Sequence, residues 1–70
     1  MSRWVIERGD RITVRKDGRV VRQEDNMREA VHLVQVAFEE GDTVFVTDDD
    51  GYRSNFTRKF QRGTAERMNW

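Results

Sequence analysis

The chain has 70 residues, with 13 basic and 13 acidic side chains and no cysteine or proline. The balanced charge excludes a bulk field that would favour nucleic acid over protein, and the lack of cysteine excludes disulfides and thiolate metal sites. No apolar run approaches the roughly 20 residues of a membrane-spanning helix, and residues 1–4 do not resemble a signal peptide. We therefore expect one small soluble domain in a reducing cytoplasm, with no membrane association.

The first predicted strand, residues 3–8, has two possible registers. A two-residue turn at Gly9 and Asp10 would put Trp4 and Ile6 on the outer face of the sheet. A three-residue loop would shift the pairing by one residue and send both side chains into the core. We favour the core register, because a domain of this size needs the aromatic burial.

The Asp17-Gly18 step predicts the turn of the next hairpin, because both residue types tolerate the positive φ of a tight turn. A two-residue turn pairs Val14 with Val21, and directly paired residues share a face. Both side chains, together with Ile12, are therefore predicted to point toward the helix. The side chains predicted to point outward are Arg11, Thr13, Arg15, Val20 and Arg22.

The chain's only good amphipathic helix is predicted from about Met27 to about Glu40. Asn26 can cap its first turn, and Gly41 follows as a stop. Val36 points away from the apolar stripe and is predicted to be exposed. The stripe, predicted to be core, consists of Met27, Ala30, Val31, Val34, Ala37 and Phe38, with Leu33 on its edge.

A second Asp-Gly step, Asp50-Gly51, predicts another hairpin after the helix. A three-residue loop over residues 49–51, with Gly51 in the left-handed conformation, pairs Val46 with Ser54 on the core face. The outward side chains of this hairpin are then Phe45, Thr47, Arg53 and Asn55.

These elements predict the α+β class, with one small antiparallel or mixed sheet of four to five short strands covered on one face by one helix. The order is strand, strand, strand, helix, strand, strand. We expect residues 1–62 to form the single domain, with Phe60 closing its core. Residues 63–70 are polar apart from a few scattered apolar side chains, which predicts a frayed C-terminal tail with no site for Trp70.

No residues combine into a catalytic, metal or cofactor site. His32 lies on the solvated flank of the predicted helix, and Ser2 and Ser54 have no base beside them. The run from Asp48 to Gly51 lacks the ligand spacing of a calcium loop. We therefore expect no enzymatic activity, no bound metal and no cofactor.

The order of features carries a family resemblance. Its pieces are Trp4-Val5-Ile6, Gly9, Ile12-Thr13-Val14, the capped helix start from Asn26 to Ala30, and the strand from Val44 that runs through to Asp50-Gly51. This pattern resembles a family of short bacterial and phage domains of unknown function. The front half also looks like the arm-binding domain of tyrosine recombinases, which reads DNA with its sheet. The neutral charge and the two extra strands speak against that second assignment.

We expect a non-enzymatic binding or regulatory module whose partner is another protein. The resemblance implies that it is encoded by a phage. The alternative is a nucleic-acid-binding domain that uses the same Arg-rich outer face, since Arg and aromatic side chains are enriched on both kinds of surface. The sequence does not identify the partner or the oligomeric state. The candidate partner-binding residues are Arg11, Arg15, Val20, Arg22, Phe45 and Arg53.

Overall fold

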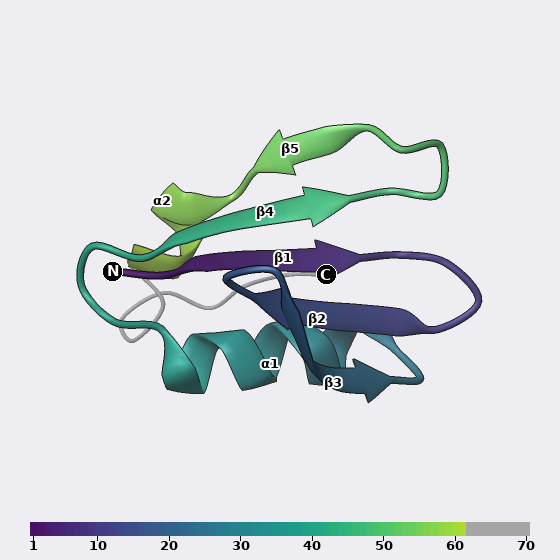
Figure 1. The fold of residues 1–70 in the computed structure, drawn as a ribbon, viewed down its shortest axis with the longest axis horizontal. Coiled ribbons are helices and arrows are strands. Elements are labelled where there is room, and N and C mark those ends of the chain that lie inside the picture. The colour runs from purple at the N-terminus through teal and green to yellow at the C-terminus, as the bar shows by residue number, and fades with distance from the viewer. Residues whose placement is uncertain (62–70) are drawn as a thin grey trace.

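The computed structural model describes residues 1–61, which form one five-stranded mixed sheet in the order β3-β2-β1-β4-β5 (Figure 1). The predicted α+β class and element order are confirmed, and a second, short helix is added. The predicted tail, residues 63–70, lies outside the described residues. The elements are β1 (Arg3–Glu7), β2 (Ile12–Lys16), β3 (Arg19–Glu24), α1 (Met27–Ala37), β4 (Thr43–Thr47), β5 (Arg53–Asn55) and α2 (Thr57–Gln61).

Strand β1 lies at the centre of the sheet and confirms the register that buries its aromatic residue. It pairs antiparallel with β2 and parallel with β4, because the connection to β4 passes through α1. Ile6 lies opposite Val14 on one side and Val46 on the other. Trp4 and Ile6 are both buried, as the three-residue loop after β1 predicts.

Both predicted turns are present. Asp17 and Gly18 have φ values of 53° and 87°, the two positive angles of a type I′ turn. In the second hairpin Val46 lies opposite Ser54, and Gly51 has a φ of 88° at the left-handed position of its loop. The local backbone requirement of Asp-Gly is sufficient to place both turns.

A β-bulge in β3 overturns part of the predicted β2–β3 register. Arg15 lies opposite Val20 as predicted, but Val14 lies opposite Arg22 rather than Val21. Val21 is the extra residue of the bulge and is 47% exposed, so its predicted place in the core is wrong. A bulge reverses the facing of every residue that follows it in the strand. Arg22 is therefore on the helix-covered side, and its predicted outward placement is also wrong.

Helix α1 begins where it was predicted and ends earlier. The side chain of Asn26 accepts a hydrogen bond of 2.9 Å from the backbone N–H of Glu29, which confirms the cap. The helix ends at Ala37 because Phe38 takes an extended conformation, with φ −63° and ψ 132°. The next backbone N–H, that of Glu39, donates to the carboxylate of Asp42, a contact that continued helix would not allow.

The core lies between the sheet and the two helices. Val36 is 73% exposed, as predicted, and Ala37 is exposed although it was expected in the core. Phe60 of α2 is buried and packs against Phe38, with 6.1 Å between the ring centroids. In Figure 1 α1 runs along β1, β2 and β3, and α2 lies beside the start of β4. The buried cluster consists of Trp4, Ile6, Ile12, Val14, Ala30, Val31, Val34, Val44, Val46 and Phe60.

Replacing the cap residue provides a test of the helix start. Asn26→Ala is expected to lower the free energy of unfolding by about 1 kcal/mol, because the N–H of Glu29 loses its acceptor. Urea denaturation followed by circular dichroism measures this change. Asn26→Asp is the matched control: a carboxylate also caps, so its stability should stay close to that of the wild type. Equal losses in both variants would show that this side chain does not act as a cap.

Candidate functional site

The face of the sheet opposite the helices is the candidate site, and we call it the open face. Because α1 and Phe60 of α2 pack into the core on the other side, no described residue outside the sheet and its turns covers it. Its members pair with one another across the strands. They are Arg3, Val5 and Glu7 of β1, Thr13 and Arg15 of β2, Val20 and Gln23 of β3, Thr43, Phe45 and Thr47 of β4, and Arg53 and Asn55 of β5.

The centre of the open face is apolar. Val5 lies directly opposite Phe45 on one side and Arg15 on the other, and it is 7% exposed although neither helix reaches it. The guanidinium carbon of Arg3 lies 5.4 Å from the centroid of the Phe45 ring, within range of a cation–π interaction. Val5 is already shielded by its neighbours in the sheet, so the apolar surface that a partner can exclude from water belongs to half-buried Phe45 and exposed Val20.

The positive charge of Arg15 is balanced within the face. Its Nε lies 3.0 Å from a carboxylate oxygen of Glu7, and its Nη1 donates to the carbonyl of Gly18 at 3.2 Å. The side chains of Arg15 and Glu7 are 38% and 36% exposed, so the ion pair is partly buried against the sheet and does not extend into solvent. Arg15 is thus partly committed to internal contacts, which reduces what it can offer to a partner.

A hollow of about 460 Å³ opens on this face. Neither Arg3 nor Arg53 forms an ion pair with any residue in the described part of the chain. Hydrogen bonds, first from the backbone N–H of Arg3 and then from the side chain of Ser2, hold the pKa of Asp17 below its ordinary value. The hollow is lined by Arg3, Val5, Glu7, Arg15, Asp17, Gly18 and Arg53.

The structure brings together four of the six predicted candidates and separates two. Arg15, Val20, Phe45 and Arg53 lie on the open face. Arg11 lies in the connection before β2, where it forms an ion pair of 3.4 Å with Asp25 and does not reach the hollow.

Arg22 is the second predicted candidate that does not lie on the open face. It pairs with Glu24 at 3.1 Å on the helix-covered side of the sheet, as the bulge in β3 requires. Sequence reasoning also missed three contributors from β1, namely Arg3, Val5 and Glu7. Alternation along the first strand would have found them, because burying Trp4 and Ile6 turns these three neighbours outward.

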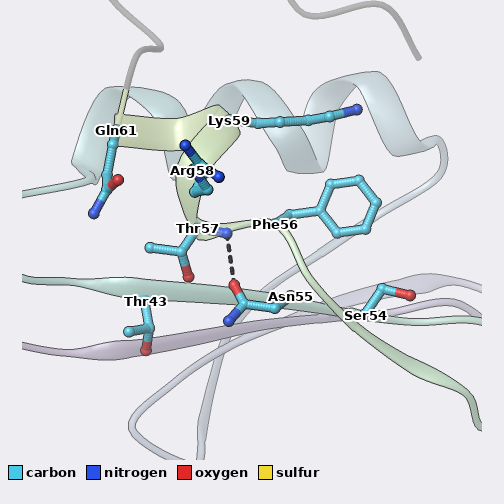
Figure 2. A pocket seen from close by; sticks show the side chains of 8 residues that line it. All are labelled: Thr43, Ser54, Asn55, Phe56, Thr57, Arg58, Lys59 and Gln61. Carbon is cyan, nitrogen blue, oxygen red and sulfur yellow. Dashed lines mark hydrogen bonds between the residues drawn. The ribbon is translucent and has the colours of Figure 1, made fainter.

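A larger hollow of about 780 Å³ lies between β5 and α2 (Figure 2). Figure 2 shows that Lys59 and Phe56 extend to one side and Gln61 to the other, so the polar groups do not converge. Asn55 accepts a hydrogen bond of 2.9 Å from the N–H of Thr57, whose hydroxyl in turn accepts one of 3.0 Å from the N–H of Val44. These groups serve the start of α2 and the sheet, so the hollow is a feature of the fold.

Asp42 is a buried acid that belongs to the fold rather than to the open face. Its carboxylate accepts hydrogen bonds from the N–H of Ser2 at 2.8 Å, the indole of Trp4 at 3.0 Å and the N–H of Glu39 at 3.0 Å. Burial alone raises the pKa of this carboxyl, but the three hydrogen bonds outweigh burial and hold the pKa below its ordinary value. The group joins the start of β1, the end of α1 and the start of β4.

Comparison with known proteins adds no family: no family model, curated protein or solved structure matches the chain. The resemblance to short bacterial and phage domains therefore stays a prediction. Within residues 1–61, no helix is long and apolar enough to cross a membrane. In the same residues no three His, Asp or Glu side chains form a group that could hold a metal ion.

Proposed function

We propose that this chain is a non-enzymatic protein-binding module that engages its partner through the open face. The observation that carries the proposal is an apolar centre, Val5 and Phe45, framed by three arginines and left uncovered by both helices. Arginine and aromatic side chains are the residues enriched where proteins meet. The chain's one imidazole, His32, is exposed on α1 and so lies on the other side of the sheet from the open face.

The charges of the open face favour a protein partner over a nucleic acid. Glu7 and Asp17 both line the hollow and oppose a continuous row of phosphates. Phe45 is the single aromatic side chain of the face, whereas platforms for single strands stack successive bases on several rings. Nucleic-acid binding through the same arginines is the second candidate, and the cytoplasmic location and phage origin stay predictions.

Affinity capture with matched variants tests the proposal. The immobilised wild-type chain and Val36→Ser are expected to retain the same protein from lysate of the source cells, because Val36 is exposed on α1, away from the open face. Phe45→Ser should lose it, since truncation of a central anchor costs roughly 2 kcal/mol or more of binding free energy. Circular dichroism checks that each variant is folded. If Phe45→Ser does not fold, Arg53→Ala, a substitution at an exposed position of the open face, replaces it in the same capture experiment.

Nuclease and salt separate the two candidate functions. Capture by protein contacts should survive nuclease and change little with ionic strength, whereas phosphate contacts weaken steeply as salt rises. Loss of the captured protein after nuclease treatment would replace the proposal with the nucleic-acid alternative. Undiminished capture by folded Phe45→Ser would exclude the open face and direct attention to the flank of α1 around His32 and Val36.

A further inference from the structure

We infer that the open face recognises an acidic, extended segment of its partner, with one carboxylate bound between Arg3 and Arg53 and an apolar neighbour resting on Phe45. This inference depends on the proposed function, because it specifies the chemistry of the partner at that site. The inference is based on the three arginines of the hollow: Arg15 forms an ion pair with Glu7, whereas Arg3 and Arg53 form no ion pair with any described residue.

Arg3 is held in a position to bind an anion. Its backbone N–H donates to Asp17 and its carbonyl accepts from the N–H of the same residue, which fixes the start of β1. The carbon of its guanidinium lies over the Phe45 ring, 5.4 Å from the centroid. A guanidinium that lies on a ring keeps the N–H groups at its edge available, and these match a carboxylate in a two-pronged arrangement.

Arg53 approaches the same hollow from the opposite side of β4. It lies opposite Thr47 in the β4–β5 pair, whereas Arg3 lies opposite Thr43 in the β1–β4 pair, yet both line one hollow. Arg15 also lines it, but Glu7 already balances that charge. Counted together, three arginines and two acids line the hollow, so it carries a net charge of one positive beside the buried side chain of Val5. A single partner carboxylate complements this net charge at the two arginines that no described acid pairs, and a charge-assisted hydrogen bond to a guanidinium is stronger than a neutral one.

The two acids of the hollow limit what else can bind there. A phosphodiester chain carries a charge at every nucleotide, so it would meet Glu7 or Asp17 as well as the arginines. A protein segment can place one acid at the arginines and uncharged residues elsewhere. Such like-charge exclusion is a common source of partner specificity.

Titration with defined probes tests the inference on the full chain labelled with nitrogen-15. The probes are the peptide acetyl-Gly-Leu-Asp-Leu-Gly-amide, the same peptide with Asn in place of Asp, inorganic phosphate and a thymidine oligonucleotide. We expect the Asp peptide to shift the Nε–H resonances of Arg3 and Arg53 and the backbone N–H of Phe45 in a saturable manner. The Asn peptide should bind about fivefold more weakly, the ratio that corresponds to roughly 1 kcal/mol for a charge-assisted contact.

Arginine variants provide the matched controls. Arg3→Ala and Arg53→Ala should each weaken the Asp peptide about fivefold and abolish its preference over the Asn peptide. Arg28→Ala removes an exposed arginine of α1 and should leave both titrations unchanged. All three positions are exposed, so the variants are expected to fold, and circular dichroism checks this.

Three outcomes would overturn the inference. Equal affinity for the Asp and Asn peptides would show that the open face does not recognise a carboxylate. In that case, capture of a protein that depends on Phe45 would still support the proposed function. Tighter binding of the oligonucleotide than of either peptide would overturn the inference and the proposed function together. Open-face shifts that depend on protein concentration without any probe would identify a second copy of the chain as the occupant.

Discussion

Val34→Asp is expected to leave the chain unfolded in native buffer. The side chain of Val34 is fully buried between α1 and the sheet, within a cluster of apolar residues. A carboxylate at this position has no partner, and burying an unpaired charge costs several kcal/mol. A domain of this length is stable by only about 4 to 10 kcal/mol, so the change removes most or all of the stability. Circular dichroism and a thermal scan measure the loss.

Val36→Asp is the matched control for that experiment. The same substitution two residues further along α1 falls on a side chain that is 73% exposed. We expect a change within about 0.5 to 1 kcal/mol, part of which comes from placing a negative charge near the C-terminal end of the helix. If the two variants melted alike, the orientation of α1 against the sheet would be wrong.

Asp42→Ala is expected to cost about 3 kcal/mol of stability. The substitution removes the acceptor of the indole N–H of Trp4 and of the backbone N–H groups of Ser2 and Glu39. A buried donor left without a partner costs roughly 1–3 kcal/mol. The costs of the three lost hydrogen bonds do not add fully, because all three share the carboxylate of Asp42 as acceptor. The melting temperature should fall by more than 10 °C at about 4–8 °C per kcal/mol for a chain of this size. Urea denaturation gives the free energy directly.

Two variants show whether the hydrogen bonds cause that loss. Asp49→Ala makes the same chemical change at an exposed loop position and should alter stability by no more than about 0.5 kcal/mol. Trp4→Phe removes one donor and keeps most of the apolar side chain, so a smaller loss than that of Asp42→Ala is expected. A loss of stability in Asp49→Ala as large as that in Asp42→Ala would contradict the assigned role of the buried carboxylate.

The same carboxylate predicts a pH dependence. Its pKa is lower in the folded chain than in the unfolded one, so the unfolded state binds the proton more readily. Stability from Asp42 is therefore fully present above the unfolded pKa and is lost as the pH falls through the folded pKa. The difference in unfolding free energy between wild type and Asp42→Ala should shrink in that acidic range. A difference that stayed constant with pH would show that the charge itself does not stabilise the fold.

Much of the fold follows from the sequence because it depends on local backbone chemistry. The two Asp-Gly turns were predictable because few residues accept a positive φ, and Asp17, Gly18 and Gly51 have it. The cap at Asn26 and the exposure of Val36 follow from the helical period and the need to satisfy the first turn. Each of these features is decided within a few neighbouring residues.

The candidate site was only partly predictable, because its composition depends on registers that local sequence leaves open. Phe45 and Arg53 were placed correctly, since the three-residue loop fixes the register of their hairpin. Arg22 was misplaced because an edge strand can absorb an extra residue, and nothing in its composition marks the bulge. Arg3 was missed although the favoured register of the first strand already implies its position, because burying Trp4 and Ile6 turns their neighbours outward.

The sequence by itself determined the turns, the helix cap, most of the apolar stripe and the class of the fold. Tertiary structure alone decided the parallel pairing of β1 with β4, the early end of α1 and the ion pair between Glu7 and Arg15. It also decided the bonds that Asp42 accepts from Ser2 and Trp4, 40 and 38 positions away in the chain. The physical reason is that a turn or a cap is stabilised by its own backbone, whereas these contacts form only after distant segments have packed together.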